Sequence, residues 1–158
     1  MANPQLKPQI REALTLAMKS GDKVAMDALR GALSSISTAE VAGKQSRELS
    51  DDEVIGVIVR EVKLREEAAT AFRSGGREQS AGQEEAQADV LRRFLPAPMN
   101  ADELARLVDA AVQEVSSTGL SGGRAMGRVM GMLKEETAGR IDGAVVADAV
   151  KRALGMGA

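Results

Sequence analysis

The segment from Gly122 to Gly143 constrains the fold most strongly, because it combines an apolar helical stripe with glycines inside the same helix. Its apolar residues recur at the spacing i, i+3, i+4, i+7, and they are Met126, Val129, Met130 and Leu133. Such a stripe predicts an α-helix starting near Arg124 with one side against a core. Gly127 and Gly131 lie one turn apart beside the stripe, and each costs a helix about 1 kcal/mol relative to alanine. We therefore expect close packing at these two glycines against another backbone, either of a neighbouring helix or of a nucleic acid.

The core of the protein must be built almost entirely from aliphatic side chains. The chain has 158 residues, of which 44% are hydrophobic, but it contains only two Phe and no Tyr or Trp. Ala, Leu, Val, Ile and Met suit closely packed helices better than a sheet. No segment alternates polar and apolar residues as a half-buried strand does. The sequence therefore predicts an all-α fold.

Capping residues and glycines indicate where the helices begin and end. Helices are expected to follow the N-cap residues Asp22, Ser50, Asn100 and Asp142. Ser50 and Glu53 also have the spacing of a capping box, in which each side chain accepts a hydrogen bond from a free backbone N–H group. Gly21 should end the first helix. The polar, glycine-rich residues 73–82 indicate a loop or a poorly formed turn.

Two prolines mark the boundary between domains. Pro96 and Pro98 stop the helical pattern that precedes them. We expect an N-terminal helical domain over residues 1–95 and a small three-helix C-terminal domain over residues 99–158.

The residue types that are missing exclude several kinds of site. Without Cys or His, disulfides, thiol nucleophiles, imidazole catalysis and ordinary zinc ligation are excluded, and no metal or cofactor is expected. No apolar run reaches the length of a membrane span, and residues 1–9 lack the charged start and apolar core of a signal peptide. We therefore expect a cytoplasmic protein without a membrane partner. The net charge of −2 gives no global positive field, so DNA is not expected as a partner and any RNA contact must be local.

Four blocks of sequence, in this order, resemble one family. They run from Leu29 through Val41, from Glu61 through Arg77, from Leu91 through Pro96 and from Gly127 through Gly143. They are similar to the GatB/YqeY family, which comprises small free-standing proteins and the C-terminal tail of the B subunit of the glutamine-dependent tRNA amidotransferase. In that subunit the helical tail helps to hold tRNA and does not carry the chemistry.

This resemblance implies a function and a set of partners. The function is that of an amidotransferase-related accessory protein, associated with carbon–nitrogen ligase activity that uses glutamine as amide donor. The implied partners are tRNA and components of a tRNA amidotransferase or an aminoacyl-tRNA synthetase.

The residues themselves give little support for an active site. A glutamine amidase needs a nucleophile, a base and an oxyanion hole. Ser116, Ser117 and Ser121 with Lys134 form the one Ser/Lys grouping near the Gly122–Gly143 segment. Serines are also typical of loops, and this interpretation is favoured. We therefore assign no catalytic residue.

Basic residues in the same segment indicate instead a site for an RNA backbone. The candidate RNA-binding residues are Arg124, Arg128, Lys134, Gly139 and Arg140. Ser121, Gly122 and Gly123 would present free backbone N–H groups at a helix start, where a phosphate can bind. Because the sequence has no Tyr or Trp on which bases can stack, structured RNA recognised by its shape and phosphates is the expected ligand.

Two other interpretations stay open. The basic residues can be ordinary solvated side chains. Alternatively, the chain is a helical protein–protein interaction module unrelated to RNA, with residues 43–49 and 73–82 as its contact surfaces.

Overall fold

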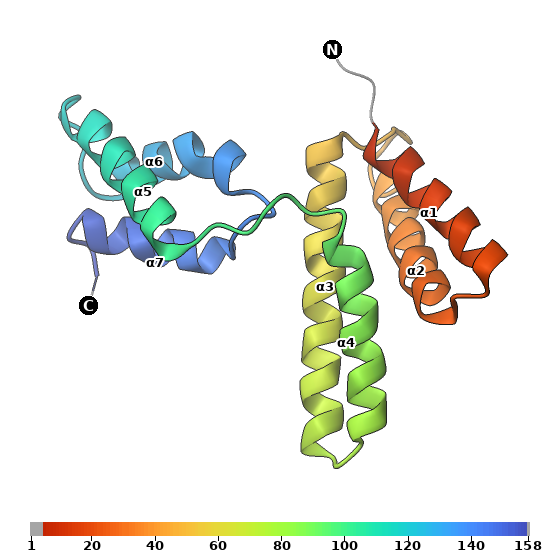
Figure 1. The fold of residues 1–158 in the computed structure, drawn as a ribbon. Coiled ribbons are helices and arrows are strands. Elements are labelled where there is room, and N and C mark those ends of the chain that lie inside the picture. The colour runs from red at the N-terminus through yellow and green to blue at the C-terminus, as the bar shows by residue number, and fades with distance from the viewer. Residues whose placement is uncertain (1–4, 158) are drawn as a thin grey trace. The chain divides into compact units, whose positions relative to one another are not determined.

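The computed structural model describes residues 5–157, and this part of the chain is all-α, as predicted (Figure 1). The helices are α1 (Leu6–Ser20), α2 (Lys23–Glu40), α3 (Asp51–Ser74), α4 (Glu78–Arg92), α5 (Ala101–Ser116), α6 (Gly122–Thr137) and α7 (Gly143–Ala153). They form two compact units, the first up to Leu95 and the second from Pro96 onward. None of the described helices has both the length and the hydropathy that crossing a membrane requires.

The predicted N-caps are confirmed by hydrogen bonds. Each of the four side chains accepts from a backbone N–H group in the first turn of its helix, and the four are Asp22, Ser50, Asn100 and Asp142. At α3 the capping box is complete, because Glu53 also accepts from the N–H group of Ser50 at 2.9 Å. Gly21 ends α1 with a φ of 72°, in the left-handed region that glycine adopts without strain. Local sequence therefore determines these helix ends.

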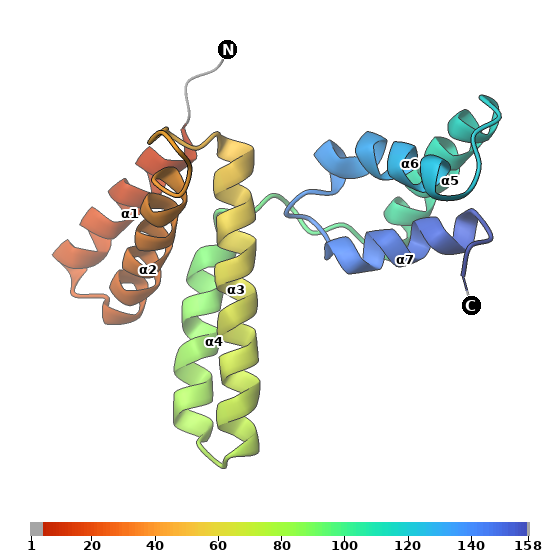
Figure 2. The ribbon, with the colours of Figure 1, turned by 180° about the vertical axis from the view of Figure 1, so that it is seen from behind.

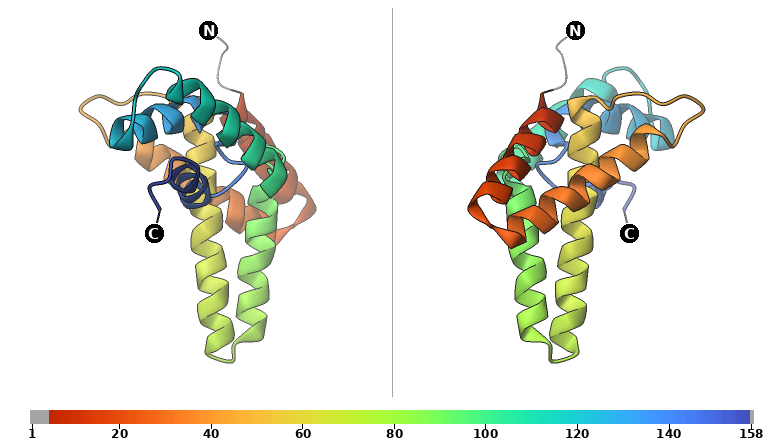
Figure 3. Two further views of the ribbon diagram at one scale, coloured as in Figure 1. Left: turned by 90° about the vertical axis from the view of Figure 1, so that its left-hand side faces the viewer. Right: turned by 90° about the vertical axis from the view of Figure 1, so that its right-hand side faces the viewer.

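In the first unit, α3 and α4 form a long antiparallel hairpin, and α1 and α2 cover one end of it (Figures 2 and 3). The largest fully buried side chains of this core are Ile10, Leu29, Ile36, Ile58 and Leu91. All are aliphatic, as the composition of the chain requires.

The prediction of a loop over residues 73–82 is wrong, because α4 already begins at Glu78. The turn between α3 and α4 is short and contains Gly76, whose φ is 73°. Ala81 is fully buried, so this part of α4 packs closely. Arg73 of α3 also hydrogen-bonds to Glu85 of α4 at 2.7 Å. Packing along α3 thus overrides the weak helix propensity of this stretch.

A half-buried polar network joins α2, α3 and α4. Glu61 accepts from the hydroxyl of Ser35 at 2.6 Å and from Nη1 of Arg65 at 2.6 Å, and Nε of Arg65 donates to Gln87 at 3.2 Å. The guanidinium of Arg65 lies above Gly31 of α2, where a Cβ atom would come within 2.7 Å of Nη2. The absence of a side chain at Gly31 makes room for this network.

In the second unit, α5, α6 and α7 each pack against the other two (Figure 2). The most completely buried side chains of this core are Val108, Val115, Ala125, Val129, Val146 and Val150. α5 and α7 turn their apolar faces into this core, where Val108, Val115, Val146 and Val150 are buried.

Candidate nucleic-acid interface

α6 has one buried face and one exposed face. The side chains that it buries are Ala125, Val129, Leu133 and Thr137. Successive residues of an α-helix are turned by about 100°, so a different set of residues lies on the opposite face. We call that set the α6 outer face, and its members, all exposed, are Arg124, Gly127, Arg128, Gly131, Lys134 and Glu135.

Gly127 and Gly131 do not make the expected close contact within the protein. A Cβ atom added at either glycine would meet no atom within 4 Å. Both glycines lie on the exposed side of α6, away from the core that α5 and α7 share with it. The prediction of close packing against a neighbouring helix is therefore wrong. Instead, the glycines leave bare backbone between Lys134 on one side and the two arginines on the other.

The three cations of the α6 outer face are not used inside the protein. In the first unit, ion pairs engage Lys7, Arg47, Arg65, Arg73 and Arg92. Within residues 5–157, by contrast, Arg124, Arg128 and Lys134 make no ion pair and no side-chain hydrogen bond. Their charges are therefore available to an anion from outside.

Charge is distributed unevenly along α6. Arg124 and Arg128 lie in the first half of the helix, whereas Glu135 and Glu136 lie near its end. The helix dipole is positive at the N-terminus, so it reinforces the two arginines. The N-terminal half of α6 is thus the part that attracts anions.

Backbone donors are also available at this end of α6. Ser121 is the N-cap residue, but its side chain accepts no hydrogen bond from the helix. The N–H groups of Gly122, Gly123 and Arg124 have no acceptor among the described residues. These groups carry partial positive charge, and they lie in the same turn as the Arg124 side chain.

Arg140, one of the candidate RNA-binding residues, belongs to the framework of the second unit. Its Nε donates to the carbonyl oxygen of Ala97 at 2.8 Å, and its Nη2 donates to the two carboxylate oxygens of Glu103 at 2.9 and 3.0 Å. The guanidinium therefore already has acceptors and ties the chain before α5 to the turn before α7. Gly139 lies in that turn with a φ of 73°, so backbone conformation accounts for the glycine without an RNA contact.

The Ser/Lys grouping does not form a catalytic pair. Ser121 precedes the first residue of α6 and Lys134 lies in its last turn, which places their backbones about 20 Å apart along the helix. Ser116 and Ser117 lie at the end of α5, and the hydroxyl of Ser117 donates to the carbonyl oxygen of Glu114. Lys134 is therefore too far from Ser121 to act as its base.

The sequence interpretation missed a groove in the first unit that is lined by α1, α2 and the end of α4. A signal was present in α1. Leu16 lies outside the apolar stripe that buries Ile10 and Ala17, and it is 60% exposed. Single exposed apolar residues are common on protein surfaces, so Leu16 alone was a weak signal.

Comparison with known proteins identifies relatives of the chain. A family model described as Yqey-like protein matches residues 7–154. An uncharacterized protein of Schizosaccharomyces pombe is 38% identical over 96 residues, which are 60% of this chain and 76% of that protein. A protein of Pyrenophora tritici-repentis, called altered inheritance of mitochondria protein 41, mitochondrial, is 28% identical over 130 residues, which are 80% of this chain and 70% of that protein.

Proposed function

The chain belongs to the YqeY-like family, and on that premise we propose that its second unit binds the phosphate backbone of structured RNA, with tRNA as the ligand. In this proposal the protein is an amidotransferase-related accessory protein that holds tRNA and has no active site of its own. The resemblance to the tRNA-holding tail of the amidotransferase B subunit supports this choice of RNA.

The observation that carries the proposal is the α6 outer face. It presents three cations without internal partners, Arg124, Arg128 and Lys134, around the bare backbone of two glycines. Cations and backbone N–H groups are the usual ligands of nucleic-acid phosphates. Because the glycines carry no side chains, a phosphodiester backbone can approach the helix closely between the cations.

The composition of the second unit favours structured RNA over single strands. Its sequence contains no aromatic residue, since the two Phe of the chain are Phe72 and Phe94. Binding of single strands relies strongly on bases stacked on aromatic side chains. A double-helical region of RNA, by contrast, is recognised by its shape and its backbone.

The proposed binding is weak and strongly salt-dependent. If three phosphates are neutralised, the logarithm of the association constant should fall with the logarithm of salt concentration with a slope of about 2 to 3. A net charge of −2 for the whole chain provides no long-range attraction to RNA.

Titration of fluorescently labelled tRNA at low salt tests the proposal. The double variant Arg128→Glu/Lys134→Glu should lose most of the binding, because it removes two contacts and adds repulsion. The matched control is Arg106→Glu/Lys151→Glu, which makes the same charge change at two exposed residues of α5 and α7 in the same unit. The control should retain nearly wild-type affinity at equal salt.

Two results would refute the proposal. One is equal loss of binding in both double variants, which would indicate that only net charge matters. The other is no binding of tRNA by the wild-type protein at low salt, which would favour a protein–protein interaction module.

A further inference from the structure

A shielded ion pair fastens the start of α1 to the end of α2. Nζ of Lys7 donates to Oε2 of Glu40 at 2.7 Å, and the two side chains are only 10% and 13% exposed. The other carboxylate oxygen of Glu40 accepts from the N–H group of Leu49 at 3.3 Å. Loss of either partner of such a pair leaves a charge without compensation in a poorly solvated place. The ion pair is therefore a specific attachment point for α1.

A second attachment of α1 comes from the first residue of α3. The carboxylate of Asp51 accepts from the backbone N–H groups of Gln5 and Leu6, at 3.0 and 2.9 Å. The start of α1 and the start of α3 accordingly lie side by side at one end of the first unit (Figure 1). A carboxylate is favourable at a helix N-terminus, where it satisfies free N–H groups and the helix dipole. We call the Lys7–Glu40 ion pair and the Asp51 cap together the α1 latch.

The other end of α1 is joined to α2 by Gly21 and Asp22 alone. Gly21 has a φ of 72°, and a Cβ atom added there would meet no atom within 4 Å. The side chain of Asp22 caps α2 by accepting from the N–H group of Ala25 at 3.0 Å, so the start of α2 does not depend on α1. A few residues at the ends of helices can absorb the dihedral changes of a hinge. α1 is thus latched at its start and hinged at its end.

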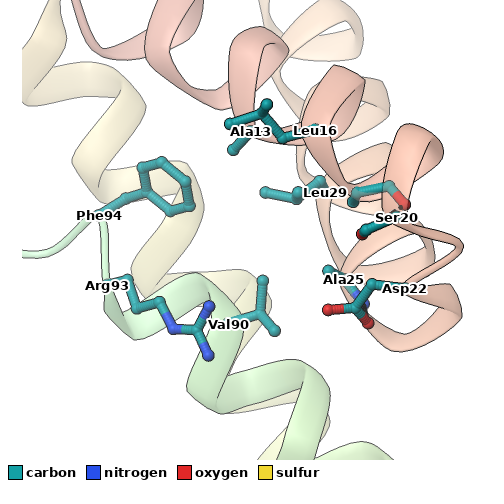
Figure 4. Close-up of a pocket in the computed structure, with 10 residues that line it drawn as sticks. Ala13, Leu16, Ser20, Asp22, Ala25, Leu29, Val90, Arg93 and Phe94 are labelled. Atoms are coloured by element: carbon teal, nitrogen blue, oxygen red, sulfur yellow. Dashed lines mark hydrogen bonds between the residues drawn. The ribbon is translucent and has the colours of Figure 1, made fainter.

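Little apolar contact holds α1 between the latch and the hinge. Ile10 and Ala17 are its buried apolar side chains, and more than half of the residues of the helix are exposed. No Cα atom of α1 lies within 8 Å of one of α4, and the structure describes both helices in full. Figure 4 shows the open groove of about 460 Å³ that separates Ala13 and Leu16 from Phe94. Opening of α1 therefore exposes far less surface than complete unfolding.

We propose that α1 is a lid of the first unit, which opens as one body about Gly21 when the α1 latch releases, while α2, α3 and α4 stay folded. The polar network around Arg65 supports the second part, because it joins α2, α3 and α4 without any residue of α1. In the open form the face of α2 beneath α1 becomes accessible.

Native-state hydrogen exchange of the full-length protein at low urea concentrations tests the lid. The α1 amides to follow are those of Leu14 and Ala17, and the core amides are those of Ile58 in α3 and Leu91 in α4. The α1 amides should exchange through an opening that has a lower free energy and a weaker urea dependence than that of the core amides. Both α1 amides should give one value, because the helix opens as one body.

Glu40→Gln tests the latch, because it removes the ion pair and keeps an acceptor for Leu49. It should lower the protection of the α1 amides and of the core amides by the same factor of about ten or more, because it destabilises the closed form alone. Asp51→Ala should act in the same way and serves if Glu40→Gln does not fold.

Arg65→Met is the matched control. It removes a charged contact of similar exposure from the network that stays intact in the open form. It should lower the protection of the core amides and leave that of the α1 amides within about twofold of wild type.

Three results would overturn the proposal. The first is that the α1 amides show the same opening free energy and urea dependence as the core amides, since α1 would then open only in complete unfolding. The second is an opening free energy that rises steadily along α1 toward Gly21 and does not respond to Glu40→Gln, which would indicate fraying. The third is that Arg65→Met lowers the protection of the α1 amides as much as that of the core amides.

Discussion

Two glycine-to-alanine substitutions should change stability in opposite directions, although both glycines lie inside helices. Helix propensity alone predicts that Gly31→Ala in α2 and Gly131→Ala in α6 each stabilise their unit by about 1 kcal/mol. At Gly131 nothing opposes this gain, because an added Cβ atom meets no atom within 4 Å. Gly131→Ala should therefore stabilise the second unit by about 1 kcal/mol.

At Gly31 the surroundings reverse the sign. A Cβ atom would lie 2.7 Å from Nη2 of Arg65, whose side chain is only 12% exposed and is held by Glu61 and Gln87. Moving the guanidinium away weakens hydrogen bonds to a charged group, each of which contributes roughly 1.5 to 3 kcal/mol. This cost exceeds the propensity gain, so we expect Gly31→Ala to destabilise the first unit by about 1 to 2 kcal/mol.

Urea unfolding followed through resolved amide signals of each unit measures both effects. The decisive control repeats Gly31→Ala in an Arg65→Met background, where the clash is absent and the same substitution should become stabilising. If Gly31→Ala stabilises the wild-type protein as much as it stabilises Arg65→Met, the polar network does not restrict this position and the reasoning fails.

Three further predictions concern single interactions. Hydrogen bonds from Arg47 hold the pKa of Glu53 at about 2, below its usual value of 4.5. The folded state should therefore lose stability as the pH falls from about 4.5 toward 2. Glu53→Gln should flatten this part of a stability–pH profile. Arg140→Ala should lower the unfolding free energy of the second unit, measured by urea unfolding, by about 1 to 2 kcal/mol. The same variant should leave the salt dependence of tRNA binding unchanged. A smaller salt slope would show that Arg140 contacts phosphate. Gly127→Leu/Gly131→Leu should leave the circular dichroism spectrum of the folded protein unchanged, because both sites are open. The same double variant should weaken tRNA binding about tenfold, because the leucine side chains hold the RNA backbone away from the helix. Unchanged affinity would contradict close approach of RNA at these glycines.

The ends of the helices could be predicted from the sequence, because a cap is a local interaction. Asp22, Ser50, Asn100 and Asp142 each bond to an N–H group within three residues. The path of residues 73–82 could not be predicted in the same way. Its helix depends on contacts with α3, including the bond from Arg73 to Glu85, and no local pattern contains them.

The position of the two glycines of α6 was in principle readable from the sequence. Gly131 lies about 160° around the helix from Leu133, the centre of the buried face, and so it belongs to the polar side. A glycine on that side meets solvent or a partner rather than the core. The presence of two glycines in one short helix suggests close packing, whereas their angular position places them on the solvent side.

The role of Arg140 was not readable, because its acceptors are distant in sequence. Glu103 and Ala97 lie 37 and 43 residues away. Before the fold is known, an arginine held by such contacts cannot be distinguished from one that binds a phosphate. The same holds for the network around Arg65, in which Gln87 lies 22 residues from the arginine.

A protein with a net charge of −2 can still present a local site for phosphate, provided that its cations are not all neutralised by its own carboxylates. Five basic side chains of the first unit form ion pairs with carboxylates, and they are Lys7, Arg47, Arg65, Arg73 and Arg92. On α6 the cations of the outer face have no such partners within residues 5–157. At physiological salt the screening length is about 8 Å, so an anion bound at Arg124 and Arg128 is affected mainly by its immediate neighbours and little by acidic residues elsewhere on the chain. A negative net charge therefore does not exclude an anion site, and pairing within the fold removes only some of the cations from consideration.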